Sequence, residues 1–137
     1  MIAAMESNEV VAAPAGPGRV VVGLIKTMRP RQWVKNAFVF AALVFDSKML
    51  QPGPLTATLA GFFALCLLSS SVYLLNDAVD VEKDRQHPKK RNRPIARGDV
   101  SPRLAILVAA VIGIGTLIAS FLLNTIFGWI GLAYLAM

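Results

Sequence analysis

Residues 55–75 read LTATLAGFFALCLLSSSVYLL, and residues 76–98, directly after them, read NDAVDVEKDRQHPKKRNRPIARG. A helix of about 20 apolar residues crosses the ~30 Å hydrocarbon core of a bilayer, and the first stretch has that length and no charge. The second stretch holds four acids and seven Lys or Arg, although only 16% of the chain is charged and 55% is hydrophobic. Charges of both signs at the edge of an apolar segment predict a functional site in a membrane protein.

Three more apolar segments indicate further helices, which we expect over residues 31–49, 104–123 and 126–137. The chain contains no Asp, Glu, Lys or Arg from Leu104 to Met137. The fourth segment would form about 18 Å of helix, which does not cross a bilayer. The sequence therefore predicts an all-α transmembrane bundle with three full spans and part of a fourth. We expect the chain to be an N-terminal fragment of a longer membrane protein.

Lys and Arg are distributed unevenly among the expected loops. Five lie before or at the start of the first span, one lies in the next loop, and eight lie in residues 83–103. Because cytoplasmic loops carry the excess of Lys and Arg, we expect the N-terminus and a catalytic loop over 76–103 to be cytoplasmic. The protein would then be a multi-pass protein of the plasma (inner) membrane.

Composition divides the chain and excludes two kinds of site. Residues 1–25 begin with a stretch rich in Ala, Pro and Gly and are predicted to form a disordered cytoplasmic tail, whereas residues 26–137 form the membrane domain. The net charge of +6 does not indicate nucleic-acid binding, because the cations lie beside apolar segments, where they set topology. Cys66 is the single cysteine, so the chain can form neither an internal disulfide nor a Cys-based metal site.

Helical geometry gathers the acidic residues of the charged stretch. If the helix of residues 55–75 continues, each residue advances by about 100°. Five side chains then share an arc of about 100°: Asn76, Asp77, Asp80, Asp84 and His87. Glu82 faces away. Three carboxylates on one face repel each other unless a cation neutralises them.

The residue types on this face favour a magnesium site. Mg²⁺ prefers oxygen ligands and is typically shared with substrate phosphates, so Asp77, Asp80 and Asp84 are the predicted metal ligands and catalytic carboxylates. The run HPKKRNRP that follows supplies guanidinium and ammonium groups, which bind phosphate. The pattern predicts metal-assisted departure of a diphosphate group.

The motif N-D-x-x-D-x-x-x-D after a second apolar span resembles the first Asp-rich motif of the UbiA-type prenyltransferase superfamily. RPRQWVKN at residues 29–36 and DRQHPKKRNRPIARG at residues 84–98 narrow the resemblance to its decaprenyl-phosphate phosphoribosyltransferases. That resemblance implies a UbiA-like bundle of about nine spans, with a second Asp-rich motif. No acid follows Asp99 here, so we expect this chain alone to be inactive.

The resemblance also implies a reaction. A polyprenyl (decaprenyl) phosphate lipid would attack the anomeric carbon of phosphoribosyl pyrophosphate, and the Mg²⁺-bound pyrophosphate would leave. The ribosylated lipid would be a precursor of cell-wall arabinan and arabinogalactan. No general base is needed, because a phosphate monoester is already anionic at pH 7. The resemblance would make seven residues substrate-binding: Asn76, Arg29, Arg31, Lys35, Lys89, Arg91 and Arg93. His87 is added to them because it lies on the acidic face.

Two other functions stay open at this point. A UbiA-type enzyme could use the same acidic face to transfer a prenyl group from a prenyl diphosphate to an aromatic acceptor. A non-enzymatic polybasic membrane segment would explain the cations, but not three Asp on one helical face. His87, beside a proline, could equally pack within its loop. Oligomerisation is possible and is not specified by the sequence.

Overall fold

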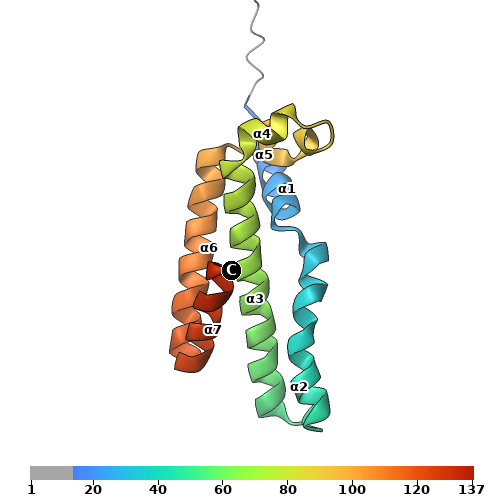
Figure 1. Cartoon of the computed structure of the whole chain (residues 1–137), viewed down its shortest axis with the longest axis vertical. Coiled ribbons are helices and arrows are strands. Elements are labelled where there is room, and N and C mark those ends of the chain that lie inside the picture. Colours follow the sequence, from blue (N-terminus) through green and yellow to red (C-terminus); the bar gives the residue numbers. More distant parts are fainter. Residues whose placement is uncertain (1–13) are drawn as a thin grey trace, which may run out of the picture.

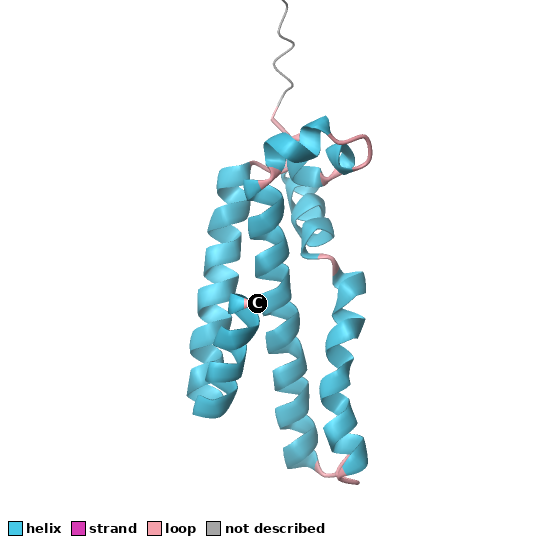
Figure 2. Ribbon diagram, in the orientation of Figure 1, coloured by secondary structure: helices cyan, strands magenta, loops and turns pink. Residues whose placement is uncertain are grey.

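The computed structural model describes residues 14–137, and within that range it contains helices and no strand (Figure 2). The helices are α1 (Pro17–Met28), η1 (Pro30–Phe38), α2 (Val39–Phe45), α3 (Pro52–Val79), α4 (Val81–Gln86), η2 (Lys90–Asn92), α5 (Pro94–Arg97), α6 (Pro102–Leu123) and α7 (Thr125–Ala136). The prediction of an all-α fold is confirmed.

The long helix α3 lies at the centre of the molecule (Figure 1). Helix α6 packs along one side of it and α7 folds back beside both, while η1 and α2 run along its other side. Small residues allow α3 and α6 to approach closely: Gly113 is buried, and a Cβ added to it would lie 3.1 Å from the Ser71 hydroxyl. Helices α4, η2 and α5 cover one end of α3, next to α1.

The ends of the long helices follow from their sequences. Pro52 and Pro102 occupy the first turns of α3 and α6, where the missing N–H costs nothing. Ser101 caps α6 by accepting a hydrogen bond from the Leu104 N–H, and Asn124 caps α7 in the same way. Helices α3 and α6 are both long and apolar enough to cross a membrane.

The segment expected to form the first span is not one continuous α-helix. Residues 30–38 form a 3₁₀ helix, and only the short helix α2 is α-helical. A 3₁₀ helix rises about 2.0 Å per residue against about 1.5 Å in an α-helix, so η1 and α2 together extend about 28 Å. Because of the larger rise per residue, this short segment is almost as long as the hydrocarbon core of a bilayer is thick.

The predicted disordered tail is wrong for residues 17–25, which belong to α1; residues 1–13 lie outside the described range. Pro17 starts the helix, and Gly23 and Thr27 are buried on its inner face. A Cβ on Gly23 would lie 2.7 Å from the Val100 side chain. Gly23 is therefore the residue that lets α1 dock closely against α5 and the turn that follows it.

Candidate functional site

The acidic face predicted from one continuous helix is interrupted. Helix α3 ends at Val79, and Asp80 adopts φ −87° and ψ 10° before α4 begins. The three carboxylates differ in burial: Asp77 and Asp84 are buried, with 4% and 2% of their surface exposed, whereas Asp80, at the break, is exposed. Asp80 therefore lies outside the pair of buried carboxylates, and its role as a metal ligand stays a prediction.

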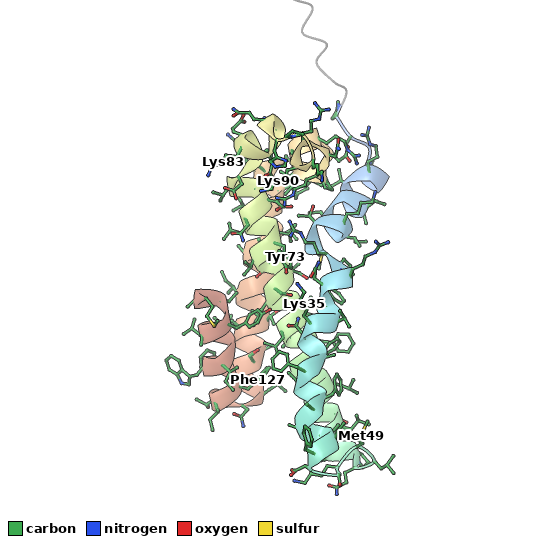
Figure 3. All side chains as sticks on the ribbon, turned by 45° about the vertical axis from the view of Figure 1, so that its right-hand side comes forward. Lys35, Met49, Tyr73, Lys83, Lys90 and Phe127 are labelled. Atoms are coloured by element: carbon green, nitrogen blue, oxygen red, sulfur yellow. The ribbon has the colours of Figure 1, made fainter. Side chains whose placement is uncertain are left out.

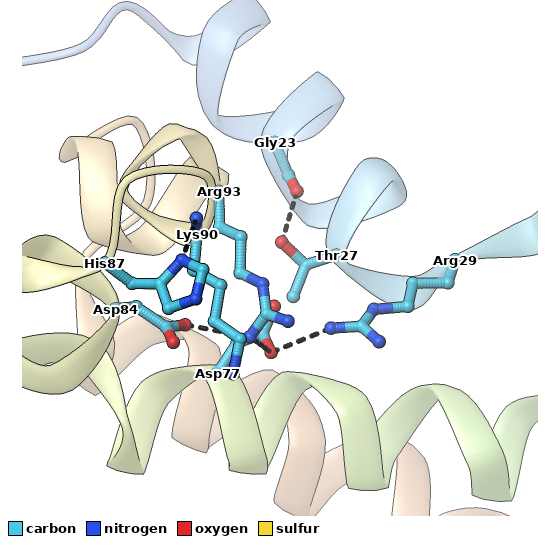
Figure 4. Close-up of polar contacts among 8 residues, drawn as sticks. All are labelled: Gly23, Thr27, Arg29, Asp77, Asp84, His87, Lys90 and Arg93. Carbon is cyan, nitrogen blue, oxygen red and sulfur yellow. Dashed lines mark hydrogen bonds and ion pairs between the residues drawn. The ribbon is translucent and has the colours of Figure 1, made fainter.

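The two buried carboxylates meet at Arg93 (Figure 4). One guanidinium nitrogen, Nη1, donates to Asp77 Oδ1 at 3.1 Å and to Asp84 Oδ2 at 2.9 Å. The Arg29 Nη2 also donates to Asp77 Oδ1, at 3.0 Å. The cluster of Asp77, Asp84, Arg29 and Arg93, called here the ion cluster, therefore carries two negative and two positive charges.

Arg29 is held by its backbone and by an aromatic ring as well as by its carboxylate. It lies between α1 and η1 with φ 54°, in the left-handed region that non-glycine residues seldom adopt. Its guanidinium carbon lies 4.5 Å from the ring centroid of Tyr73, a cation–π distance. Tyr73 precedes Asp77 by one helical turn, so both partners lie on the same face of α3.

The loop after α4 is ordered by His87 and Arg85. His87 Nδ1 accepts hydrogen bonds from the backbone N–H groups of Lys89 and Lys90, each at 3.2 Å. Arg85 Nε donates to the Ala96 carbonyl at 3.2 Å. The exposed His87 thus shapes the loop that presents Arg93 to the carboxylates.

The remaining residues predicted to bind substrate are exposed at the same end of the molecule or along η1, outside the ion cluster. They are Asn76, Arg31, Lys35, Lys89 and Arg91. Figure 3 shows Lys83 and Lys90 at this end and Met49 at the opposite end. Glu82, expected to face away, is exposed and pairs with Arg85 at 2.9 Å.

The ion cluster has a donor set that fits a divalent cation. Two carboxylate oxygens, one from α3 and one from α4, converge on one positively charged nitrogen, in the way that two ligands converge on a metal ion. Mg²⁺ is commonly held by one or two carboxylates together with substrate phosphates. Among residues 14–137 no group of three or more His, Cys, Asp or Glu is arranged to hold a metal ion. The fit is therefore to a site with two protein carboxylates, Asp77 and Asp84.

Sequence reasoning missed Tyr73, whose one-turn spacing from Asp77 could have revealed it. It also missed a second ion group, in which the buried Asp99 accepts hydrogen bonds from Arg19 at 2.6 Å and from Arg97 Nε at 2.9 Å. Arg97 and Asp99 are near neighbours in the sequence, so local spacing favours that pair. Arg19 belongs to α1, at the other end of the chain, and could not be found as a partner without the fold.

Comparison with known proteins gives the chain a family. The UbiA prenyltransferase family model matches residues 36–137. Decaprenyl-phosphate phosphoribosyltransferase of Mycobacterium tuberculosis is 42% identical over 135 residues, which cover 96% of this chain and 44% of that protein.

Two further relatives carry the same name. That of Mycolicibacterium smegmatis is 39% identical over 95% of this chain and 42% of its own length. That of Corynebacterium glutamicum is 41% identical over 74% of this chain and 32% of its own length. The chain thus spans less than half the length of these relatives. It belongs to the UbiA prenyltransferase family of integral membrane proteins.

Proposed function

We propose that the protein transfers a 5-phosphoribosyl group from phosphoribosyl pyrophosphate to a polyprenyl phosphate such as decaprenyl phosphate. The ion cluster is the observation that carries this proposal, because it places two carboxylates and two guanidinium groups together at the end of α3. Carboxylates suit a divalent cation and guanidinium groups suit phosphate. The relatives named for this reaction cover nearly the whole chain.

Asp77 and Asp84 are the residues that would hold the metal, for which we propose Mg²⁺. Enzymes of this family generally depend on a divalent metal ion. Such an ion, when bound, neutralises charge that develops on a departing pyrophosphate. Asp80 stays a proposed third ligand, and it lies exposed at the junction of α3 and α4.

The cations have separate proposed roles. Arg29 and Arg93 lie at the carboxylates, and we assign them to oxygens of the pyrophosphate. Other side chains of the same end, which we assign to the donor's phosphates, are Asn76, His87, Lys89 and Arg91. Arg31 and Lys35 on η1 are assigned to the phosphate of the lipid. Each of these groups binds and orients a substrate.

The reaction balances without a protein base. An oxygen of the lipid phosphate forms a bond to the anomeric carbon of the ribose, and the bond from that carbon to pyrophosphate breaks. The pyrophosphate leaves with the electron pair. The attacking phosphate is already anionic, so the residues of the ion cluster position charge and need not remove a proton. The product would be a precursor of cell-wall arabinan.

We also propose that α3, α6 and the η1–α2 segment each cross the bilayer, with the ion cluster on the cytoplasmic side. The excess of Lys and Arg in residues 83–103 supports this orientation. Helices α3 and α6 are long enough to span, and the extended winding of η1 supports the third crossing. Reporter fusions after residues 50 and 90 would test it, because they should lie on opposite sides of the membrane.

The proposal is tested with the full-length protein in membranes, labelled phosphoribosyl pyrophosphate, polyprenyl phosphate and Mg²⁺. We expect lipid-soluble label that requires the lipid phosphate and falls at least about 100-fold in Asp84→Asn, the range for removing a charge-stabilising group. Glu82→Gln, an exposed carboxylate on the same helix, is the matched control and should keep activity. Asp80→Asn shows whether the exposed carboxylate is a ligand.

Two results would refute the proposal. Label that survives in both Asp84→Asn and Asp77→Asn would mean that the ion cluster is structural. Folded protein that transfers no ribosyl label, but transfers a prenyl group from a prenyl diphosphate to an aromatic acceptor, would establish the other reaction of the family.

A further inference from the structure

A hollow of about 420 Å³ lies beside α1. Its charged lining comes from two distant parts of the chain: Arg19 and Lys26 from α1, and Arg97 at the end of α5 with Asp99 in the turn that follows. Neither Asp77 nor Asp84 lines it. Neither Arg29 nor Arg93 lines it either, so the hollow shares no residue with the ion cluster.

The hollow is built around one buried acid. Asp99, with 5% of its surface exposed, accepts hydrogen bonds from both Arg19 and Arg97. The Arg97 hydrogen bond and the nearby Arg19 charge hold the pKa of the Asp99 carboxyl below its ordinary value. Lys26 forms no ion pair within the described residues. Three cations against one acid leave the lining with a net charge of +2, held in place by Asp99.

The exposed side of α1 continues from this basic lining into an apolar stripe. Val21, Val22 and Ile25 are all more than half exposed, and they follow Arg19 and Lys26 around the helix at about 100° per residue. Gly23 and Thr27 face the other way, into the molecule. A helix with basic residues beside an exposed apolar stripe and no acid is typical of one that lies in the membrane interface.

We infer that the hollow binds the phosphate of an anionic phospholipid, with Arg19, Lys26 and Arg97 around the headgroup and Val21 and Ile25 against its acyl chains. The net positive lining supplies the charge complementarity. The apolar stripe beside it distinguishes a lipid from a soluble phosphate compound, which would gain nothing from exposed valine and isoleucine. This inference does not depend on the transfer reaction, and its test measures binding.

The experiment uses full-length protein purified in a neutral detergent, with phosphatidylglycerol, phosphatidylcholine, polyprenyl phosphate or inorganic phosphate added. Native mass spectrometry counts the bound molecules. The first variant is Lys26→Gln, because Lys26 is exposed and its loss disturbs no ion pair within the described residues. The matched control is Lys83→Gln, an exposed lysine of α4 at the same end of the molecule. Ile25→Ser tests the apolar stripe.

We expect phosphatidylglycerol to bind in preference to phosphatidylcholine and to bind about fivefold more weakly to Lys26→Gln, the effect of one cation near an anionic lipid. Lys83→Gln should bind normally, and Ile25→Ser should weaken the lipid but not inorganic phosphate. Equal losses in the two lysine variants, or no loss in Lys26→Gln, would overturn the inference. Two other results would overturn the phospholipid assignment. Unchanged lipid binding in Ile25→Ser would indicate a site for free phosphate. Lys26-dependent binding of polyprenyl phosphate alone would indicate a substrate site.

Discussion

Replacing Arg93 by Gln should destabilise the protein by about 2–3 kcal/mol, a figure that follows from its burial and its partners. Breaking a buried ion pair by removing one partner costs about 3–5 kcal/mol, because an unpaired charge stays buried. The Arg93 side chain keeps 29% of its exposure and so stays partly hydrated, which puts the cost at or just below the lower end of that range. Asp84 loses its sole ion-pair partner among the described residues, while Asp77 keeps Arg29. The variant cluster would carry a net charge of −1.

The assay is thermal and denaturant unfolding of full-length protein in detergent or nanodiscs, followed by tryptophan fluorescence. The control is Arg91→Gln, in which a nearby exposed arginine is neutralised with the same change in net charge. It should change stability by less than about 0.5 kcal/mol, as surface substitutions usually do. Equal stability of the two variants would refute the ion cluster as described, because Arg93 would then not bridge buried carboxylates.

Three other predictions concern packing and charge elsewhere. Gly23→Ala should cost about 1–3 kcal/mol of unfolding free energy, because its methyl group would lie 2.7 Å from Val100; Gly18→Ala, which meets nothing within 4 Å, should be neutral. The Asp99 carboxyl has a pKa lowered from 3.8, so its stabilisation is present above pH 3.8 and is lost as the pH falls through the folded-state pKa. The stability difference between wild type and Asp99→Asn should therefore be full near pH 7 and shrink below about pH 4. Gly113→Leu should separate α3 from α6 and lower the unfolding temperature measurably, whereas unchanged stability would contradict their close approach.

The helices were predictable where one signal dominated. Long uncharged runs indicated α3 and α6, but α3 begins at Pro52, before the expected start at residue 55. The segment over 31–49 was apolar enough to be recognised, but its 3₁₀ winding was not predictable. Hydrophobicity reports that a segment is buried or faces lipid, and it does not report the rise per residue.

The site was predictable in composition and only partly in geometry. The argument from helical spacing correctly paired Asp77 with Asp84, because their separation is almost two helical turns even across a break. Asp80, where the break occurs, is exposed, and its role as a ligand stays a prediction. Arg93 was expected to bind a phosphate of the substrate, which stays a proposal, but its bridging of two carboxylates depends on how the loop after His87 folds back. Helix α1 was missed because a stretch with Gly and Pro reads as flexible when its docking partner, at residues 94–100, lies far along the chain.

The charge of the ion cluster would couple the proposed binding of a metal ion to the proposed binding of phosphate. Two carboxylates and two guanidinium groups sum to zero, so a divalent cation alone would leave this partly buried site with a charge of +2. A diphosphate group brings the compensating negative charge and gives Arg29 and Arg93 new partners. Millimolar Mg²⁺ alone should therefore stabilise the wild-type protein little, and Mg²⁺ with phosphoribosyl pyrophosphate should stabilise it strongly. In Arg93→Gln the cluster is already negative, so Mg²⁺ alone should restore part of the lost stability. If Mg²⁺ does not change the stability of this variant, Asp77 and Asp84 do not form a metal site.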